Sequence, residues 1–227
     1  KILMFDLDDT LLDFSANETE SLNKLFQQHG YTFSDELFRV YNSVNKQLWT
    51  DYENGKIELD DVLNTRFSET MLRLGKVVDG AEWENLYREL LGNGCQLIEG
   101  ALELCQSLSV SHRLFVITNG ITQTQIKRLK QSGLYKFFED IFDSQSIGFQ
   151  KPSKEFFGYV ASHIKDFNMK EALIIGDSLN TDIKGGFLSG IDTCWIKRGS
   201  QKCPAEMPIN HTVTNLAELY NICSPVV

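Results

Sequence analysis

The chain has 227 residues, 42% of them hydrophobic, which is enough for one large domain or for a domain that carries an insertion. Its 31 acidic and 22 basic residues give a net charge of -9, and no stripe of lysine and arginine forms, which argues against a nucleic-acid polymer as partner. No apolar run approaches the roughly 20 residues of a membrane span. We expect a globular protein with no membrane partner that is a monomer or a weak homo-oligomer.

The cysteines are odd in number and scattered, and they form no C-x-x-C pair with zinc spacing. They are Cys95, Cys105, Cys194, Cys203 and Cys223. This pattern favours reduced, structural thiols in a cytoplasmic protein.

A short apolar run at the start of the chain, Ile2-Leu3-Met4-Phe5, predicts a buried strand that stops at an acid, Asp6. Asp8 follows two residues later, on the same side wherever the extended conformation persists. Two neighbouring carboxylates repel, so we expect a divalent cation, or a proton on one of them, to offset the repulsion. The ordinary alternative is that Asp8 and Asp9 are turn formers before Thr10.

The chain then changes character twice. From about Ser15 to Gly94, apolar residues recur at helical spacing with no convincing strand. From about Glu99, strands alternate with helices. The predicted strands are Arg113 to Thr118, Asp140 to Ser144, Ala172 to Gly176 and Thr193 to Lys197. The predicted helices are Ala101 to Ser109, Thr122 to Ser132, Ser153 to Ile164 and Thr181 to Leu188.

This alternation predicts the α/β class, with a Rossmann-like parallel sheet and helices on both of its faces. The first strand belongs to the same sheet, because it could not be stable alone. We therefore predict a core of residues 1–14 and 98–227, interrupted by an all-helical cap domain over residues 15–97.

Polar residues follow four of the predicted strands. Besides Asp6 and Asp8, these segments are Thr118-Asn119-Gly120, then Lys151 before Pro152, and Asp177 with Asp182. Taken singly, each has an ordinary explanation as a turn, a solvated lysine or a helix cap. Together they bring carboxylates, a hydroxyl, an amide and an ammonium to one edge of a parallel sheet, which is suited to a phosphate and a metal ion.

In these motifs, D-L-D-D-T, T-N-G, K-P and G-D-x-x-x-x-D, the chain resembles the haloacid dehalogenase superfamily, in the subgroup with small helical caps. Residues 44–57 and the segment Thr193-Cys194-Trp195 are also similar to the bacterial noncanonical pyrimidine nucleotide 5'-nucleotidases.

The resemblance implies a magnesium-dependent phosphatase. Asp6 would be the nucleophile and Asp8 the general acid and base. Mg²⁺ would bind the Asp6 carboxylate, the backbone carbonyl of Asp8 and the Asp177 carboxylate. Asp182 would orient a metal-bound water or Lys151. The phosphoryl oxygens would be held by Thr118, Asn119, Gly120 and Lys151.

The substrate implied by the resemblance is a small phosphorylated metabolite, and in particular a pyrimidine nucleoside 5'-monophosphate. Trp49 and Tyr52 of the cap are candidates to contact its base, and Asn45 to hydrogen-bond a base or sugar. The alternative is that the aromatic residues pack the cap's own core and that Asn45 lies at the surface. Rival functions are a sugar-phosphate phosphatase or phosphomutase, a haloacid dehalogenase, and a non-catalytic binding protein. The dehalogenases lack the second acid that Asp8 supplies.

Overall fold

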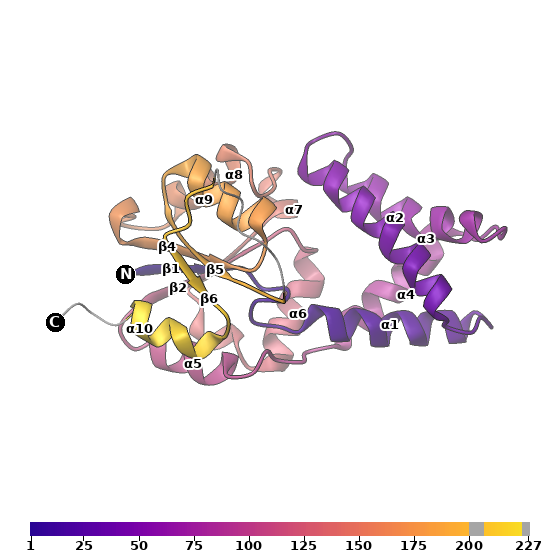
Figure 1. Cartoon of the computed structure of the whole chain (residues 1–227), viewed down its shortest axis with the longest axis horizontal. Helices are drawn as coiled ribbons and strands as arrows, with labels where there is room; N and C mark the ends of the chain where they lie inside the picture. The colour runs from indigo at the N-terminus through magenta and orange to yellow at the C-terminus, as the bar shows by residue number, and fades with distance from the viewer. Residues whose placement is uncertain (200–206, 224–227) are drawn as a thin grey trace. The chain divides into compact units, whose positions relative to one another are not determined.

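The computed structural model describes residues 1–199 and 207–223, which form two compact units (Figure 1). One unit joins Lys1–Phe14 to Cys95–Val227, and the other is the intervening Ser15–Gly94. The second boundary of the insert thus follows Gly94, where the sequence analysis places it after residue 97. That the insert determines which substrate is bound stays a prediction.

A six-stranded sheet organises the first unit, and every pair of neighbouring strands is parallel. The strand order is β3-β2-β1-β4-β5-β6. The strands are β1 (Ile2–Phe5), β2 (Arg113–Thr118), β3 (Asp140–Asp143), β4 (Ala172–Gly176), β5 (Asp192–Ile196) and β6 (His211–Val213). The predicted Rossmann-like α/β class is confirmed. The sequence analysis does not predict β6, because this strand has only three residues and two of them are exposed.

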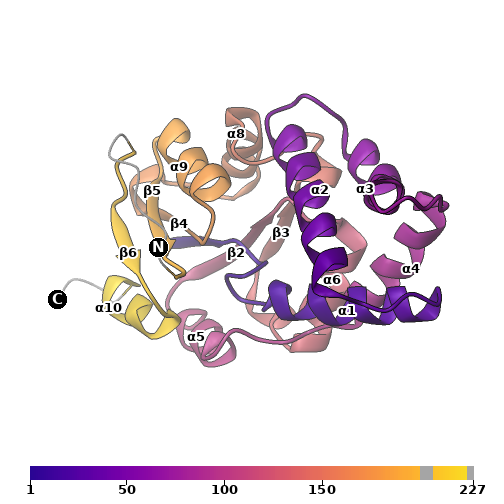
Figure 2. The same ribbon diagram turned by 45° about the vertical axis from the view of Figure 1, so that its right-hand side comes forward.

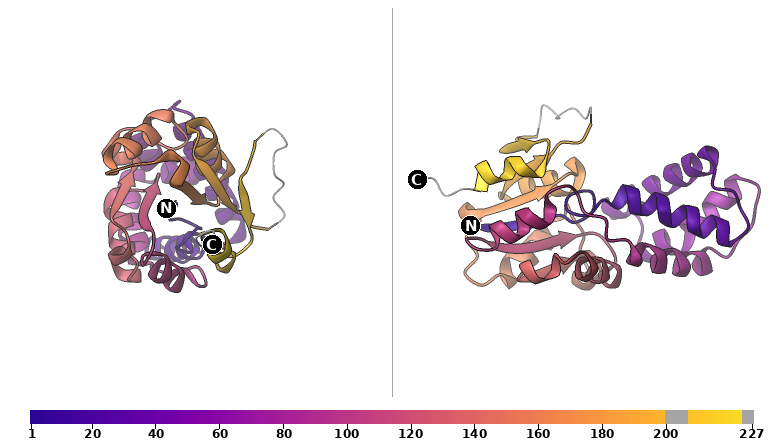
Figure 3. Two further views of the ribbon diagram at one scale, coloured as in Figure 1. Left: turned by 90° about the vertical axis from the view of Figure 1, so that its left-hand side faces the viewer. Right: turned by 90° about the horizontal axis from the view of Figure 1, so that it is seen from below.

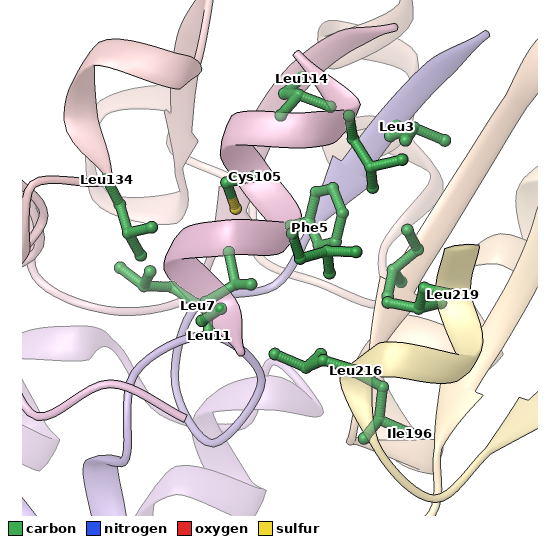
Figure 4. Close-up of a cluster of buried hydrophobic side chains, with 14 of the residues drawn as sticks. Leu3, Phe5, Leu7, Leu11, Cys105, Leu114, Leu134, Ile196, Leu216 and Leu219 are labelled. Atoms are coloured by element: carbon green, nitrogen blue, oxygen red, sulfur yellow. The ribbon is translucent and has the colours of Figure 1, made fainter. Parts of the chain in front are cut away.

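Alternation of side chains along the strands supplies an apolar face on each side of the sheet. Leu3 and Phe5 belong to a cluster with residues of α5, α6 and α10. Figure 4 labels Cys105 of α5 and Leu219 of α10 in this cluster. Ile2 and Met4 belong to a cluster with residues of α8 on the other face. Figures 1 and 2 show α5 and α10 on one side of the strands and α8 and α9 on the other. These helices are α5 (Ala101–Leu108), α6 (Thr122–Ser132), α8 (Lys154–His163), α9 (Lys184–Ser189) and α10 (Leu219–Cys223).

The predicted helix from Thr181 to Leu188 consists of two pieces. A π-helical turn, η3 (Leu179–Ile183), precedes α9. A Cβ atom at Gly185 would lie 2.2 Å from the ring of Phe157 in α8, and one at Gly186 would lie 2.2 Å from the Thr193 methyl group in β5. Both glycines therefore allow α9 to pack directly against α8 and β5. The remaining short elements of this unit are α7 (Ser144–Ile147), η1 (Tyr135–Phe137), η2 (Met169–Glu171) and η4 (Leu216–Glu218).

The second unit contains four helices joined by short loops and no strand, as the apolar spacing predicts. Its helices, drawn in indigo to magenta in Figure 3, are α1 (Phe14–Gln28), α2 (Asp35–Glu53), α3 (Leu59–Arg73) and α4 (Gly80–Asn93). Aromatic residues from all four helices are buried together in its interior: Phe26, Tyr41, Phe67, Trp83 and Tyr87.

A buried ion pair lies inside this helical unit. The Arg66 guanidinium donates to both carboxylate oxygens of Glu84 at 2.6 and 2.7 Å, and it lies over the ring of Tyr87 at 4.6 Å. Burial raises the pKa of Glu84, and the neighbouring Arg66 opposes this effect. The charge of Glu84 is tolerated in the interior because Arg66 pairs with it.

Four of the cysteines, Cys95, Cys105, Cys194 and Cys223, are free thiols, and the last three of them are buried. Cys203 lies outside the described residues. Among the helices of the described residues, none has both the length and the apolar character that crossing a membrane requires.

Loss of the buried guanidinium is expected to destabilise the helical unit. Arg66→Met leaves the Glu84 carboxylate buried without its bidentate partner, so the free energy of unfolding should fall by about 3–5 kcal/mol. Urea unfolding followed by circular dichroism measures this change. Arg73→Met, the same substitution at an exposed site of α3, is the control. The double variant Arg66→Met/Glu84→Gln should lose less than Arg66→Met alone, and a larger loss would contradict this account.

Candidate active site

The first acid of the chain lies at the carboxyl end of the central strand, β1. Its backbone N–H donates to Ile175 O at 2.8 Å, which prolongs the pairing with β4 by one residue. The buried Asp6 carboxylate accepts hydrogen bonds at both oxygens, from Thr10 Oγ1 at 3.1 Å and from Lys151 Nζ at 2.7 Å. The orientation of the Asp6 side chain is therefore fixed.

The ammonium group of Lys151 lies in the interior at this edge of the sheet, and Lys151 is only 2% exposed. Its three donors are matched by three acceptors: Asp6 Oδ1 at 2.7 Å, Asp182 Oδ1 at 2.7 Å and Ile117 O at 2.9 Å. Burial alone would lower the pKa of Lys151, but Asp182 and Asp6 raise it above its ordinary value. Lys151 is thus held as a cation between two carboxylates.

Asn119 holds the backbone of Lys151 in place. Its Nδ2 donates to Lys151 O at 3.0 Å, and its Oδ1 accepts from Lys151 N at 2.9 Å. The predicted contact between Asn119 and phosphate therefore has to use its backbone, because both polar side-chain atoms are engaged in positioning the lysine.

Two further acids come from the segment that follows β4. Asp182, in η3, is fully buried, and its Oδ2 accepts from Ser178 N at 3.2 Å. A Cβ atom at Gly176 would lie 2.2 Å from that same oxygen, so the last residue of β4 has to be glycine for Asp182 to fit. The carbonyl oxygen of Asp177 accepts from Trp195 Nε1 at 2.9 Å, which ties the segment to β5.

Carboxylate oxygens of Asp6, Asp177 and Asp182 lie within 4.8 Å of one another. Desolvation by burial, opposed by Lys151, raises the pKa of Asp6 well above its ordinary value. Burial and the nearby Asp182 also raise the pKa of Asp177, to about 7. The site therefore has a local excess of negative charge that one lysine does not fully balance.

Thr118 ends β2 beside these acids and is buried. Its Oγ1 accepts from Gly120 N at 3.0 Å and from Gln125 Nε2 at 3.0 Å. Because both lone pairs of the oxygen are used, the hydroxyl proton is free to be donated elsewhere.

Asp8 lies beyond the end of β1, with its side chain 29% exposed. Its Oδ2 accepts from Gln125 Nε2 at 2.6 Å, and its Oδ1 accepts from Arg128 Nη1. The sequence analysis does not identify these two residues of α6. Glutamines and lysines recur in this helix beside its one arginine, and only the packing of α6 decides which of these side chains face Asp8.

The structure places the candidate cap residues, Asn45, Trp49 and Tyr52, on α2 of the helical unit. Tyr52 is buried and its ring lies 5.7 Å from that of the partly exposed Trp49. Asn45 donates to Glu18 Oε1 at 3.3 Å and accepts from Arg66 Nη1 at 3.4 Å. The roles of all three toward a substrate stay predictions.

Comparison with known proteins identifies the class to which this fold and site belong. Residues 1–190 match the model of the haloacid dehalogenase-like hydrolase family, and the chain belongs to that family. The prediction of a hydrolytic enzyme of this superfamily is thereby confirmed.

Three relatives that this chain matches over most of their length are similar to it in sequence. HAD-hydrolase YfnB of Bacillus subtilis is 44% identical over 98% of this chain and 94% of its own. Its crystal structure, bound to magnesium, has a TM-score of 0.94 and covers 98% of both chains. Pyrimidine 5'-nucleotidase PynA of Streptococcus pneumoniae is 40% identical over 86% of this chain and 83% of its own. Pyrimidine 5'-nucleotidase YjjG of Escherichia coli is 30% identical over 96% of this chain and 95% of its own.

The raised pKa of Asp177 predicts how the stability of the metal-free protein changes with pH. Between its ordinary value of 3.8 and about 7, the folded state retains a proton that the unfolded state releases. The free energy of unfolding should therefore fall as the pH rises through this interval. Urea unfolding in EDTA measures the fall.

Asp177→Asn is expected to reduce the fall, since the amide does not titrate. Asp140→Asn, at the exposed start of β3, is the control and should retain the wild-type slope. A slope in Asp177→Asn as steep as that of the wild type would contradict the assignment.

Proposed function

We propose that this enzyme is a magnesium-dependent phosphatase that hydrolyses small phosphate monoesters through an aspartyl-phosphate, with pyrimidine nucleoside 5'-monophosphates as its preferred substrates. The observation that carries the proposal is the buried Lys151 ammonium, which binds Asp6 and Asp182 at the sheet edge where Asp177 and Thr118 also lie. The names of the relatives PynA and YjjG support the choice of substrate.

The donor set of the site fits a magnesium ion. Hard divalent cations prefer oxygen ligands, and the clustered carboxylates of Asp6 and Asp177 provide them. By the resemblance to the haloacid dehalogenase superfamily, the third protein ligand would be the backbone carbonyl of Asp8. Asp182, whose oxygens accept from Lys151 and from Ser178, would orient Lys151. When bound, Mg²⁺ would neutralise the carboxylates and the charge on the phosphoryl oxygens.

Asp6 acts as the nucleophile. One of its carboxylate oxygens bonds to phosphorus while the bond from phosphorus to the leaving oxygen breaks, and Asp8 gives that oxygen a proton. In the second half-reaction Asp8 takes a proton from water, and the water oxygen attacks phosphorus and releases Asp6. Thr10 and Lys151 keep Asp6 oriented throughout.

The equatorial phosphoryl oxygens are held by the Thr118 hydroxyl and by the backbone N–H of Asn119. The Gly120 N–H acts through Thr118, to which it donates, and Lys151, whose three donors bind Asp6, Asp182 and Ile117 O, contributes its positive charge. Negative charge on these oxygens is concentrated during transfer, so fixed donors there stabilise the transition state more than the free substrate. The two hydrogen bonds that Thr118 Oγ1 accepts leave its proton for this purpose.

Removal of the nucleophile is expected to abolish catalysis. The wild-type enzyme with Mg²⁺ should release inorganic phosphate from nucleoside 5'-monophosphates, and Asp6→Asn should lose on the order of 10³-fold or more in kcat. A panel of pyrimidine and purine nucleotides and sugar phosphates, assayed with Mg²⁺ or with EDTA, measures both activity and preference.

Asp140→Asn serves as the matched control, because this aspartate is exposed and begins its strand. Full activity in Asp6→Asn, or no phosphate release from any ester by the wild type, would refute the phosphatase. A preference for sugar phosphates would refute only the choice of nucleotides as substrates.

The insert is expected to act on substrate preference through Trp49, whose ring is partly exposed. Stacking on a base contributes about 1–3 kcal/mol, so Trp49→Ala should raise KM for a pyrimidine nucleotide on the order of tenfold. The KM for 4-nitrophenyl phosphate, which has no base, should change much less. Thr50→Ala, at the exposed neighbouring residue, is the control. Equal losses on both substrates would mean that Trp49 only supports the fold of the insert.

A further inference from the structure

Two side chains of α6 donate hydrogen bonds to the carboxylate of Asp8 from the side of the core. Gln125 Nε2 donates to Oδ2 at 2.6 Å, and Arg128 Nη1 donates to Oδ1. Gln125 and Arg128 are each only 1% exposed, so they come from the interior toward a partly exposed acid. The rotation of the Asp8 carboxylate is therefore restrained at both of its oxygens.

The amide of Gln125 is itself oriented by Arg128. Its Oε1 accepts from Arg128 Nη1 at 2.9 Å, which turns the two N–H groups of Nε2 toward Asp8 and Thr118. A flipped amide would bring its N–H groups against those of the guanidinium. One guanidinium thus fixes Gln125, and Gln125 connects the proposed acid with the proposed phosphate donor.

The loop after β2 is shaped to leave room for this amide. A Cβ atom at Gly120 would lie 2.2 Å from Gln125 Nε2, so a side chain there would displace it. Gly120 also donates its backbone N–H to Thr118 Oγ1 at 3.0 Å. Gln125 Nε2 is the second donor to this oxygen. The hydroxyl proton of Thr118 therefore points away from both Gly120 N and Gln125 Nε2.

Stability alone does not account for such a network. Replacing buried ion pairs by apolar side chains of similar volume is often neutral or stabilising. Arg128 and Gln125 instead place buried polar groups in a helix whose neighbouring residue, Leu129, lies in the apolar core. This arrangement favours a role in the chemistry of the acid that they hold.

We propose that Gln125 and Arg128 are positioning residues of the reaction, which hold the Asp8 carboxylate in line for proton transfer and direct the Thr118 hydroxyl at the phosphoryl group. The inference rests on the proposed function. A carboxylate has four lone-pair sites, and the two side chains use two of them. One of the two remaining lone-pair sites can carry the proton that Asp8 gives to the leaving oxygen. The same site can later take a proton from water.

The test compares two esters that differ in their need for an acid. A nucleoside 5'-monophosphate expels an alkoxide, which must be protonated, whereas 4-nitrophenyl phosphate expels a phenolate that leaves without a proton. The value of kcat/KM reports the steps up to transfer to Asp6, so the ratio of kcat/KM between the esters isolates the acid. Asp8→Asn should lower this ratio on the order of 10²-fold or more.

Arg128→Met is expected to lower the same ratio about tenfold, because Asp8 loses one restraint and Gln125 its orientation. Arg128→Lys, which keeps a donor, should recover part of this loss. Gln125→Met should lower the ratio similarly and also lower kcat/KM for both esters, because Thr118 loses its second donor. Gln123→Met, the same substitution at an exposed position of α6, is the matched control.

A double-mutant cycle separates positioning from a general loss of structure. In the Asp8→Asn background, Arg128→Met should leave the ratio unchanged, because no acid remains to be positioned. Equal losses on both esters, or an unchanged ratio in Arg128→Met, Arg128→Lys and Gln125→Met, would overturn the inference. An active wild type with the expected Asp8→Asn effect would then leave the proposed phosphatase intact, whereas an inactive wild type would refute that function itself.

Discussion

The candidate site depends on one constraint: an ammonium group that is buried and has to be surrounded by acceptors. Lys151 is stable there because Asp6, Asp182 and the Ile117 carbonyl accept hydrogen bonds from its three N–H groups. Each acceptor comes from a different part of the chain, so this contact joins the ends of β1 and β2 to η3. The parallel order of the sheet makes the meeting possible, since these segments follow strands that are neighbours or nearly so.

Around this cation the polar residues divide into two groups. Asp6, Asp177 and Asp182 form the acidic side, where burial raises the pKa of Asp6 and Asp177 and where the clustered carboxylate oxygens suit a cation. Thr118, Gln125 and Arg128 form a hydrogen-bonded side that reaches Asp8. The two acids of the first motif are thus held by different partners, which fits the different roles that we propose for them.

Much of this arrangement can be predicted from the sequence. The apolar run before Asp6 and the runs before Thr118 and Asp177 mark strands, and parallel strands bring their carboxyl ends to one edge. The helical spacing from Ser15 to Gly94 likewise predicts an insert without strands. These features follow from local patterns that the fold preserves.

The rest depends on packing that no local pattern encodes. Gln125 and Arg128 resemble the other polar residues of α6 until the helix docks on the sheet. The Asn119 side chain binds the Lys151 backbone only because two loops meet, and the short β6 carries too few apolar residues to stand out.

One measurement tests the central claim most directly. The enzyme is quenched with acid during turnover of a nucleotide, and the trapped protein is reduced with borohydride, which converts an aspartyl-phosphate to homoserine. The account predicts homoserine at Asp6, and turnover with homoserine at another aspartate, or at none, would contradict it.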